Sequence, residues 1–243
     1  MKISYDACWQ TMTGMMRAHA DILLVVAGAF LFLPMLAQAI YLPPPAPTSA
    51  DIAALEGLLD FYRANFLPFF LVRLITLAGT ACLLALLLAP DRPTVADSIR
   101  RATLLLPSLL LADILVQLLV GLGMIALLLP GLYLLGRTAL TMPAMVAERI
   151  TNPLRAIQRS FQLTDRAGWS ILGLILVIMI VAWIATFAAV TVVGVVLQLL
   201  LPTGAARLSV EVLQALQPAV LTMIYALLGA AIYRQVMAFK GGN

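Results

Sequence analysis

The sequence predicts an all-α polytopic membrane protein with six transmembrane helices, arranged in three hairpins that each follow a cytoplasmic amphipathic elbow helix. Of its 243 residues, 63% are hydrophobic and only 11% are charged, and the mean hydropathy is +1.05. An average soluble domain has roughly 45–50% apolar and about 25% charged residues. This composition excludes a soluble enzyme, a disordered chain and a nucleic-acid-binding domain as first interpretations. We expect residues 1–243 to form a single integral-membrane domain.

Five apolar runs are long enough for helices to cross the hydrocarbon core, which takes about 20 residues per crossing. Residues 103–147 are too long for one crossing and suit two, with a break at Gly121/Gly123 or at Pro130-Gly131. Pro130-Gly131 is favoured because proline suits the first turn of a helix. The run from Trp169 to Leu201 is expected to cross and then continue along the far surface. The predicted spans are residues 22–42, 66–89, 103–127, 131–146, 169–194 and 218–235.

The distribution of basic residues orients this topology. Six crossings put both termini on one side, and cytoplasmic loops carry an excess of Lys and Arg. With both termini inside, the outer segments hold only Arg63 and Arg207, while Arg73 and Arg137 lie within spans. The inner segments hold Lys2, Arg17, Arg92, Arg100, Arg101, Arg149, Arg155, Arg159, Arg166, Arg234 and Lys240. The sequence therefore predicts a membrane protein with both termini in the cytoplasm.

A cleavable signal peptide is the alternative interpretation of the first span. Lys2 and Arg17, the apolar core and the small residues Ala37-Gln38-Ala39 have the general pattern of one. However, the apolar run 22–42 has the length of a span. We expect it to be retained.

Three segments before spans are predicted to be amphipathic helices on the cytoplasmic surface: residues 3–18, 93–102 and 152–166. In the last, Asn152 can cap the helix and Pro153 fits its first position. Leu154, Ile157 and Phe161 share one face, and arginines share the opposite face, as in a helix lying in the headgroup layer. The residues predicted to face anionic headgroups are Arg100, Arg101, Arg155, Arg159 and Arg166. Residues 48–63 and 207–216 are predicted to be short helices on the outer surface.

Three ionisable residues, Arg73, Asp113 and Arg137, are predicted to lie inside the membrane, with Gln117 one turn from Asp113. Such residues are costly in lipid and are candidate functional groups. Both arginines are placed about 10 Å below the outer boundary at 1.5 Å per residue. Either arginine could pair with Asp113, each could extend outward to the headgroups, or the group could bind a substrate or lipid headgroup.

Motifs for catalysis or cofactor binding are missing from the sequence. The single histidine, His19, lies outside every predicted span, and Cys8 and Cys82 make neither a disulfide framework nor a zinc site. There is no P-loop or glycine-rich nucleotide fingerprint. We therefore expect no catalytic residues, no cofactor and no metal.

One stretch carries a family resemblance. Its residues are Leu129-Pro130-Gly131-Leu132-Tyr133, Arg137, Pro143, Glu148, Pro153, Ala156, Arg159-Ser160-Phe161, Leu163-Thr164 and Trp169. The pattern resembles the membrane domain of some glycerophosphoryl diester phosphodiesterases and the related stand-alone YciC-type bacterial inner-membrane proteins. The resemblance implies a bacterial inner-membrane protein but no reaction, because the His-Arg-Gly motif and metal-binding carboxylates of the phosphodiesterase catalytic domain are missing.

Two functions from different classes follow from these features. The first is a non-enzymatic multi-pass inner-membrane protein, associated with the envelope and its lipids or acting as an accessory subunit of a membrane complex. The alternative is a transporter or lipid-handling protein that uses the intramembrane polar residues, and a membrane-embedded enzyme is a third hypothesis. Membrane lipids with anionic headgroups are the expected partners, with a protein partner or a homo-oligomer as alternatives; nucleic acid is not expected.

Overall fold

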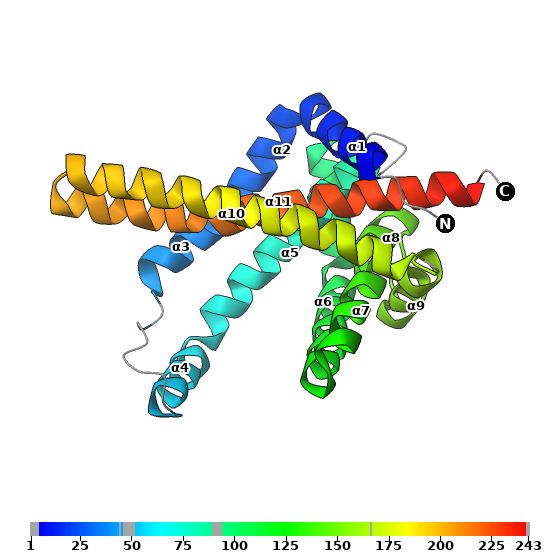
Figure 1. Ribbon diagram of the computed structural model, residues 1–243, viewed down its shortest axis with the longest axis horizontal. Coiled ribbons are helices and arrows are strands. Elements are labelled where there is room, and N and C mark those ends of the chain that lie inside the picture. Colours follow the sequence, from blue (N-terminus) through cyan, green and yellow to red (C-terminus); the bar gives the residue numbers. More distant parts are fainter. Residues whose placement is uncertain (1–4, 44, 46–51, 89–93, 166, 242–243) are drawn as a thin grey trace.

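The computed structural model describes the chain except for residues 1–4, 44, 46–51, 89–93, 166 and 242–243. The described residues form helices and connecting segments, with no strand among them (Figure 1). The helices are α1 (Tyr5–Ala18), α2 (Ala20–Ala27), the π-helical turn η1 (Gly28–Phe32), α3 (Leu33–Tyr41), α4 (Ile52–Ala64), α5 (Phe66–Leu88), α6 (Val95–Ala126), α7 (Leu128–Thr138), α8 (Thr141–Glu148), α9 (Pro153–Leu163), α10 (Gly168–Leu200) and α11 (Thr203–Gly241).

Within the described residues, five helical segments are long and apolar enough to cross a membrane. They are Ala20–Tyr41, Phe66–Leu88, Val95–Ala126, Gly168–Leu200 and Gly204–Lys240. The first combines α2, η1 and α3. Its π-helical turn comes just before Pro34, whose missing N–H cannot complete the regular helical hydrogen bonding. Helices of this length and composition are consistent with a multi-pass membrane protein.

The predicted fourth span, residues 131–146, consists of two short helices, α7 and α8. Neither has the length of a crossing, so the six-span topology stays a prediction. The break before α7 is at Leu127, whose backbone is extended (φ −160°, ψ 137°), and not at Pro130-Gly131. Pro130 lies in the first turn of α7, where a backbone N–H has no partner within the helix, so proline loses no hydrogen bond there. The break between the two helices therefore comes before Pro130. A Cβ on Gly131 would fall 2.5 Å from the backbone nitrogen of Met124, so this glycine lets α7 pack closely on α6.

Two of the predicted surface segments are parts of longer helices. Residues 95–102 continue without a break into the rest of α6, which begins after its N-cap Thr94, while Pro93 lies outside the described residues. Residues 207–216 are likewise part of α11, which has Pro218 inside it, and α10 continues straight to Leu200. The chain therefore makes no elbow at residue 102, and α10 runs as one helix through the residues predicted to continue along the far surface. No residue near 102 breaks a helix, and apolar helices tolerate internal proline.

The other predicted surface helices form, with shifted bounds. α1 ends at Ala18, and His19, with a non-helical backbone, separates it from α2. α9 begins after Asn152, whose Oδ1 accepts hydrogen bonds from the N–H groups of Leu154 (3.0 Å) and Arg155 (3.3 Å). α4 covers residues 52–63 of the predicted outer helix and ends at Ala64, while residues 48–51 are outside the described part of the chain.

The helices pack around α5 and the hairpin of α10 and α11. In Figure 1 this hairpin lies along the long axis, with its turn projecting beyond the other helices, and α5, α6 and α7 run across it. The second half of α5, from Leu77 to Leu87, is buried, and it lies in one apolar core with Leu31 of η1 and Leu227 of α11. The outer face of α10 exposes large apolar side chains, among them Trp183 and Phe187. Such an exposed face is expected where lipid is the solvent.

A glycine sets the distance between α5 and the first predicted span. A Cβ built on Gly79 would overlap the Cβ of Phe30 in η1, and it would also lie 3.4 Å from Leu31. The overlapping atom is attached directly to the backbone, so the helices themselves would have to move apart. Gly79 therefore fixes the close contact between η1 and α5.

We expect Gly79→Ala to lower the free energy of unfolding by about 1–3 kcal/mol, the usual cost of forcing extra atoms into a filled interior. Gly121→Ala is the matched control, because a Cβ at Gly121 meets no atom within 4 Å and alanine favours a helix. Thermal unfolding in detergent, followed by tryptophan fluorescence, measures both variants. Equal melting temperatures for the two variants would contradict the close contact.

The amino-terminal helix α1 packs on the last part of α11. Cys8, Met12 and Met15 are buried, and the Cys8 thiol donates a hydrogen bond to Oε1 of Gln235 over 2.8 Å. Burial raises the pKa of the Cys8 thiol from 9.0 to about 11. The thiolate is the reactive form of cysteine, so Cys8 should be a poor nucleophile while α1 is docked.

We expect the native protein in detergent to react only slowly with a maleimide at pH 8. A pKa of about 11 leaves about a hundredfold less thiolate there than a pKa of 9.0, and Cys82 is buried as well. Gln10→Cys, on the exposed side of α1, is the control that should label rapidly. Labelling of Cys8 should speed up as the pH approaches 11. Native labelling of Cys8 as fast as that of the thiol introduced by Gln10→Cys would show that α1 is not docked.

Candidate functional site

Asp113 of α6 is held by Arg73 of α5. Arg73 Nη2 lies 2.6 Å from both carboxylate oxygens of Asp113, and Nε lies 3.1 Å from Oδ2. The exposed fraction is 16% for the carboxylate side chain and 48% for the guanidinium side chain. Charge-assisted, two-point hydrogen bonding of this kind is stronger than a neutral contact. Of the two arginines considered for Asp113, the structure places Arg73 beside it.

The ion pair forms part of the wall of a cavity of about 390 Å³ between the helices. Gln117 lines the same cavity, together with Tyr225 of α11 and several threonines. Methionine, leucine and valine side chains make up the rest of the wall. Three of the four predicted intramembrane polar residues, Arg73, Asp113 and Gln117, therefore meet at one site.

A second cavity, of about 460 Å³, adjoins the first. Arg73, Met35 and Thr76 line both cavities, and Gln38 and Gln214 add amide groups to the second. Arg73 is thus the charged group at the boundary between the two spaces. The Arg73 side chain is 48% exposed because it faces both cavities.

The threonine hydroxyls of the first cavity fall into two kinds. Thr80 and Thr222 donate to carbonyls of their own helices, at Thr76 and Pro218 respectively, each over 2.8 Å. Thr141 differs, because its side chain is buried, with 2% of the residue exposed, and its hydroxyl has no hydrogen-bond partner. A buried hydroxyl without a partner costs roughly 1–3 kcal/mol. The Thr141 hydroxyl is therefore available for a polar group of a molecule in the cavity.

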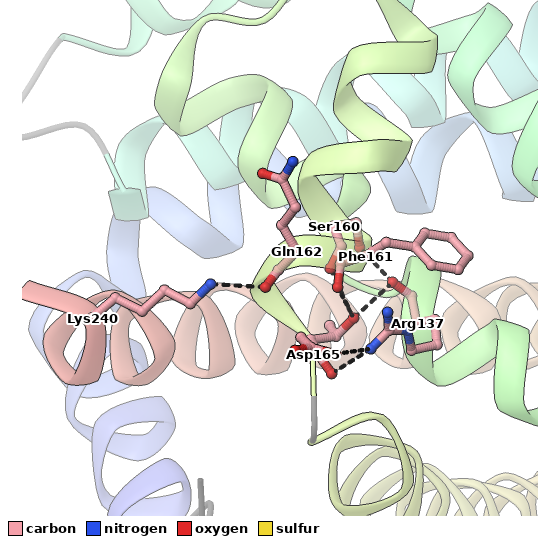
Figure 2. A network of polar contacts seen from close by, with 7 residues as sticks. Arg137, Ser160, Phe161, Gln162, Asp165 and Lys240 are labelled. Atoms are coloured by element: carbon pink, nitrogen blue, oxygen red, sulfur yellow. Dashed lines mark hydrogen bonds and ion pairs between the residues drawn. The ribbon is translucent and has the colours of Figure 1, made fainter.

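Arg137, the fourth predicted residue, does not reach Asp113. Its side chain extends from α7 to the end of α9 (Figure 2). There Nη1 donates to the carbonyl of Thr164 over 2.9 Å and lies 3.7 Å from Asp165. Its guanidinium carbon is 5.0 Å from the centre of the Phe161 ring, and Ser160 donates to the Arg137 carbonyl over 2.7 Å. The prediction that Arg137 could pair with Asp113 is wrong for this structure.

The predicted depth of Arg137 also conflicts with its surroundings. The six-span topology puts Arg137 near the outer boundary, yet it contacts residues 160–165, which the same topology assigns to the cytoplasmic side. Arg137 reaches these residues because α9 packs against α7 and α10 begins beside Gly136. A Cβ on Gly136 would lie 2.7 Å from the carbonyl oxygen of Gly168.

A second cation joins Arg137 at the end of α9. Lys240 of α11 donates to the carbonyl of Gln162 over 2.7 Å (Figure 2). The last carbonyls of a helix lack partners within it and carry partial negative charge, so cations stabilise this end. Arg137 and Lys240 therefore fix α9 to α7 and α11, which is a structural role.

The arginines predicted to face headgroups differ in their surroundings. Arg159 points inward, with Nε 2.9 Å from both carboxylate oxygens of Glu148, and Tyr233 donates to the same carboxylate over 3.0 Å. Arg159 meets Glu148 because the small buried side chains Ala156 and Ser160 turn this side of α9 toward α6 and α8; that it faces headgroups stays a prediction. Arg100 and Arg155 are exposed, and Arg101 is half-buried. Arg166 lies outside the described residues.

Sequence reasoning missed Thr141, Tyr225 and the Glu148–Tyr233 contact. Glu148 and Tyr233 both stand at the cytoplasmic ends of predicted spans, so their common depth was a usable signal. Thr141 and Tyr225 had no such signal, because a hydroxyl in an apolar run most often bonds to its own helix. In the described part of the chain, no group of three or more His, Cys, Asp or Glu side chains could hold a metal.

The fold and this site define a class, a helical membrane protein with a polar cavity between its helices. Comparison with known proteins does not narrow the class, because no protein-family model, no curated protein and no solved structure matches this chain.

We expect Asp113→Asn to lower the free energy of unfolding by about 1–2 kcal/mol, because it leaves the Arg73 charge without its counter-ion among apolar helices. Asp60→Asn is the matched control, since the Asp60–Arg63 pair is highly exposed and such pairs contribute little. Folded yield and thermal unfolding in detergent measure the effect. No loss in Asp113→Asn relative to Asp60→Asn would rule out a stabilising pair.

Proposed function

We propose that this protein binds an amphipathic molecule with an anionic group, such as a membrane lipid, in the cavity beside Arg73. The observation that carries the proposal is the composition of that cavity. An arginine–aspartate pair and a buried hydroxyl without a partner line a space of about 390 Å³ between helices whose other exposed surfaces are largely apolar. Ionisable groups in such a setting mark substrate pathways and binding sites.

The geometry suits an anionic group at Arg73 and an apolar chain beside it. A guanidinium has five N–H donors, and the Asp113 carboxylate contacts only Nε and Nη2. The remaining donors can serve a carboxylate or phosphate of the ligand. Met35, Leu77 and Met179 offer an adaptable apolar wall for its chain, and Thr141 can supply a hydrogen bond.

This is the lipid-handling alternative raised by the sequence, and it involves binding without covalent chemistry. It is preferred over the accessory-subunit hypothesis because that hypothesis relies on arginine-faced surface helices. Arg159 is turned to Glu148, and residues 95–102 belong to the long helix α6. Membrane lipids remain the proposed partners.

The location and the kinship of the protein are also proposals. Basic residues gather in the segments that the predicted six-span topology puts inside, which supports both termini in the cytoplasm. The bacterial inner membrane is proposed from the family resemblance. The motif residues from Leu129 to Trp169 support kinship with the YciC-type proteins. In the structure this stretch forms α7, α8 and α9 with their connections.

Lipids retained after purification in mild detergent, identified by mass spectrometry, test the proposal. We expect Arg73→Gln to retain about one anionic lipid fewer per protein, because it removes the charge at the cavity. Asp113→Asn should retain more than the parent protein, because the guanidinium loses its internal competitor. Arg63→Gln removes an equal but exposed charge and is the control. Unchanged retention in both Arg73→Gln and Asp113→Asn would overturn the proposal.

A further inference from the structure

A third cavity lies away from the Arg73 site, where α5, α6 and α8 meet. It has a volume of about 230 Å³. Ala81 and Ala85 of α5, Arg101 of α6 and Arg149 at the end of α8 line it, with Thr151 two residues after Arg149. Arg73, Asp113 and Gln117 do not contribute to its wall, so it is separate from the proposed binding cavity.

The wall of this cavity has a charged part and an apolar part. Arg101, Arg149 and Thr151 supply N–H and O–H donors, and alanine, leucine and valine supply the rest. A guanidinium matches phosphate geometry with two parallel hydrogen bonds. Its five donors also allow it to keep a contact within the protein while it binds a phosphate oxygen.

The backbone of Arg149 is unusual. With φ 55° and ψ 38° it is the one non-glycine residue with positive φ in the described chain. The turn ends α8, since the N–H groups of Arg149 and Ile150 both bond to the carbonyl of Met145. Glycine is the usual residue at such a helix end because a Cβ is strained there. An arginine at this position places a guanidinium at the cavity at a cost in backbone energy.

The surroundings favour a lipid over a free anion. Arg101 comes two residues before the predicted start of a span at residue 103, which is headgroup depth. Leu104, also in the cavity wall, is 74% exposed, so the apolar part opens to the outer face of α6. A phosphate held by the arginines can therefore leave its acyl chains along an apolar helix surface. Basic pockets between membrane helices are suited to anionic headgroups.

We propose that Arg101 and Arg149 form a binding site for the phosphate headgroup of an anionic phospholipid, with Thr151 at its rim. The site does not depend on the cavity at Arg73. An anionic lipid bound here joins α6 to the end of α8, and it should stabilise the folded protein by binding to it alone.

The test is thermal unfolding of the full-length protein in detergent, titrated with dioleoyl phosphatidylglycerol. Dioleoyl phosphatidylcholine, which has no net charge, and inorganic phosphate, which has no acyl chain, are the comparison ligands. We expect phosphatidylglycerol alone to raise the melting temperature with saturation. Stabilisation of equal size by phosphatidylcholine would overturn the role of charge, and stabilisation by inorganic phosphate would overturn the assignment to a lipid.

Arg149→Gly is the decisive variant. Glycine adopts a positive φ without strain, so the helix end should persist while the guanidinium is lost. We expect the half-saturating phosphatidylglycerol concentration to rise at least about tenfold in Arg149→Gly and in Arg101→Gln, since each loses a charge-assisted contact. Arg101→Gln, within the second turn of α6, carries the test if Arg149→Gly yields no folded protein.

Two control variants separate this site from general surface charge and from the Arg73 cavity. Arg155→Gln removes an exposed arginine of α9 and should leave the half-saturating concentration nearly unchanged. An equal weakening there would show that general surface charge, and not this site, binds the lipid. In a protein that already carries Arg73→Gln, Arg149→Gly should still raise the half-saturating concentration, so a failure at the Arg73 cavity and a failure here give different patterns. Unchanged affinity in both Arg149→Gly and Arg101→Gln would overturn the proposal.

Discussion

The hydrocarbon interior of a membrane offers no hydrogen bonds, and this constraint governs the whole structure. Every polar group placed there has to find a partner inside the protein. The backbone meets the requirement with long helices, and threonines such as Thr80 and Thr222 donate to carbonyls of their own helices. Arg73 and Asp113 satisfy each other across two helices. The hydroxyl of Thr141 is left without a partner, and it lines the same cavity as that ion pair.

Small residues decide which polar groups meet. Gly79 lets α5 approach the first predicted span, and Gly131 and Gly136 bring α7 against α6 and α10. Without a strong hydrophobic force between helices in lipid, such close packing is a principal source of association. The close approach at Gly136 takes Arg137 to the end of α9. Arg73 is then the arginine left to pair with Asp113.

The two proposed sites use arginine in different ways. Arg73 stands among apolar helices and already has a carboxylate partner, so an anionic ligand must compete with Asp113 for it. Arg101 and Arg149 lie at the predicted level of the headgroups, where an anion need not leave the polar layer. A ligand that enters the first site would exchange one counter-ion for another. A lipid in the second would act as a fixed part of the helix packing.

Composition and apolar run length by themselves determined the helical membrane class, the location of five long apolar segments and the short list of intramembrane polar residues. They did so because these properties depend on local sequence and on the solvent. The partner of Asp113, the inward turn of Arg159 and the unbroken helix through residue 102 were decided only by the tertiary structure. The choice between Arg73 and Arg137 depends on where glycines let helices touch, and the side of α9 that faces the protein depends on where Ala156 and Ser160 can pack. Such contacts join residues far apart in the chain, and no local pattern encodes them.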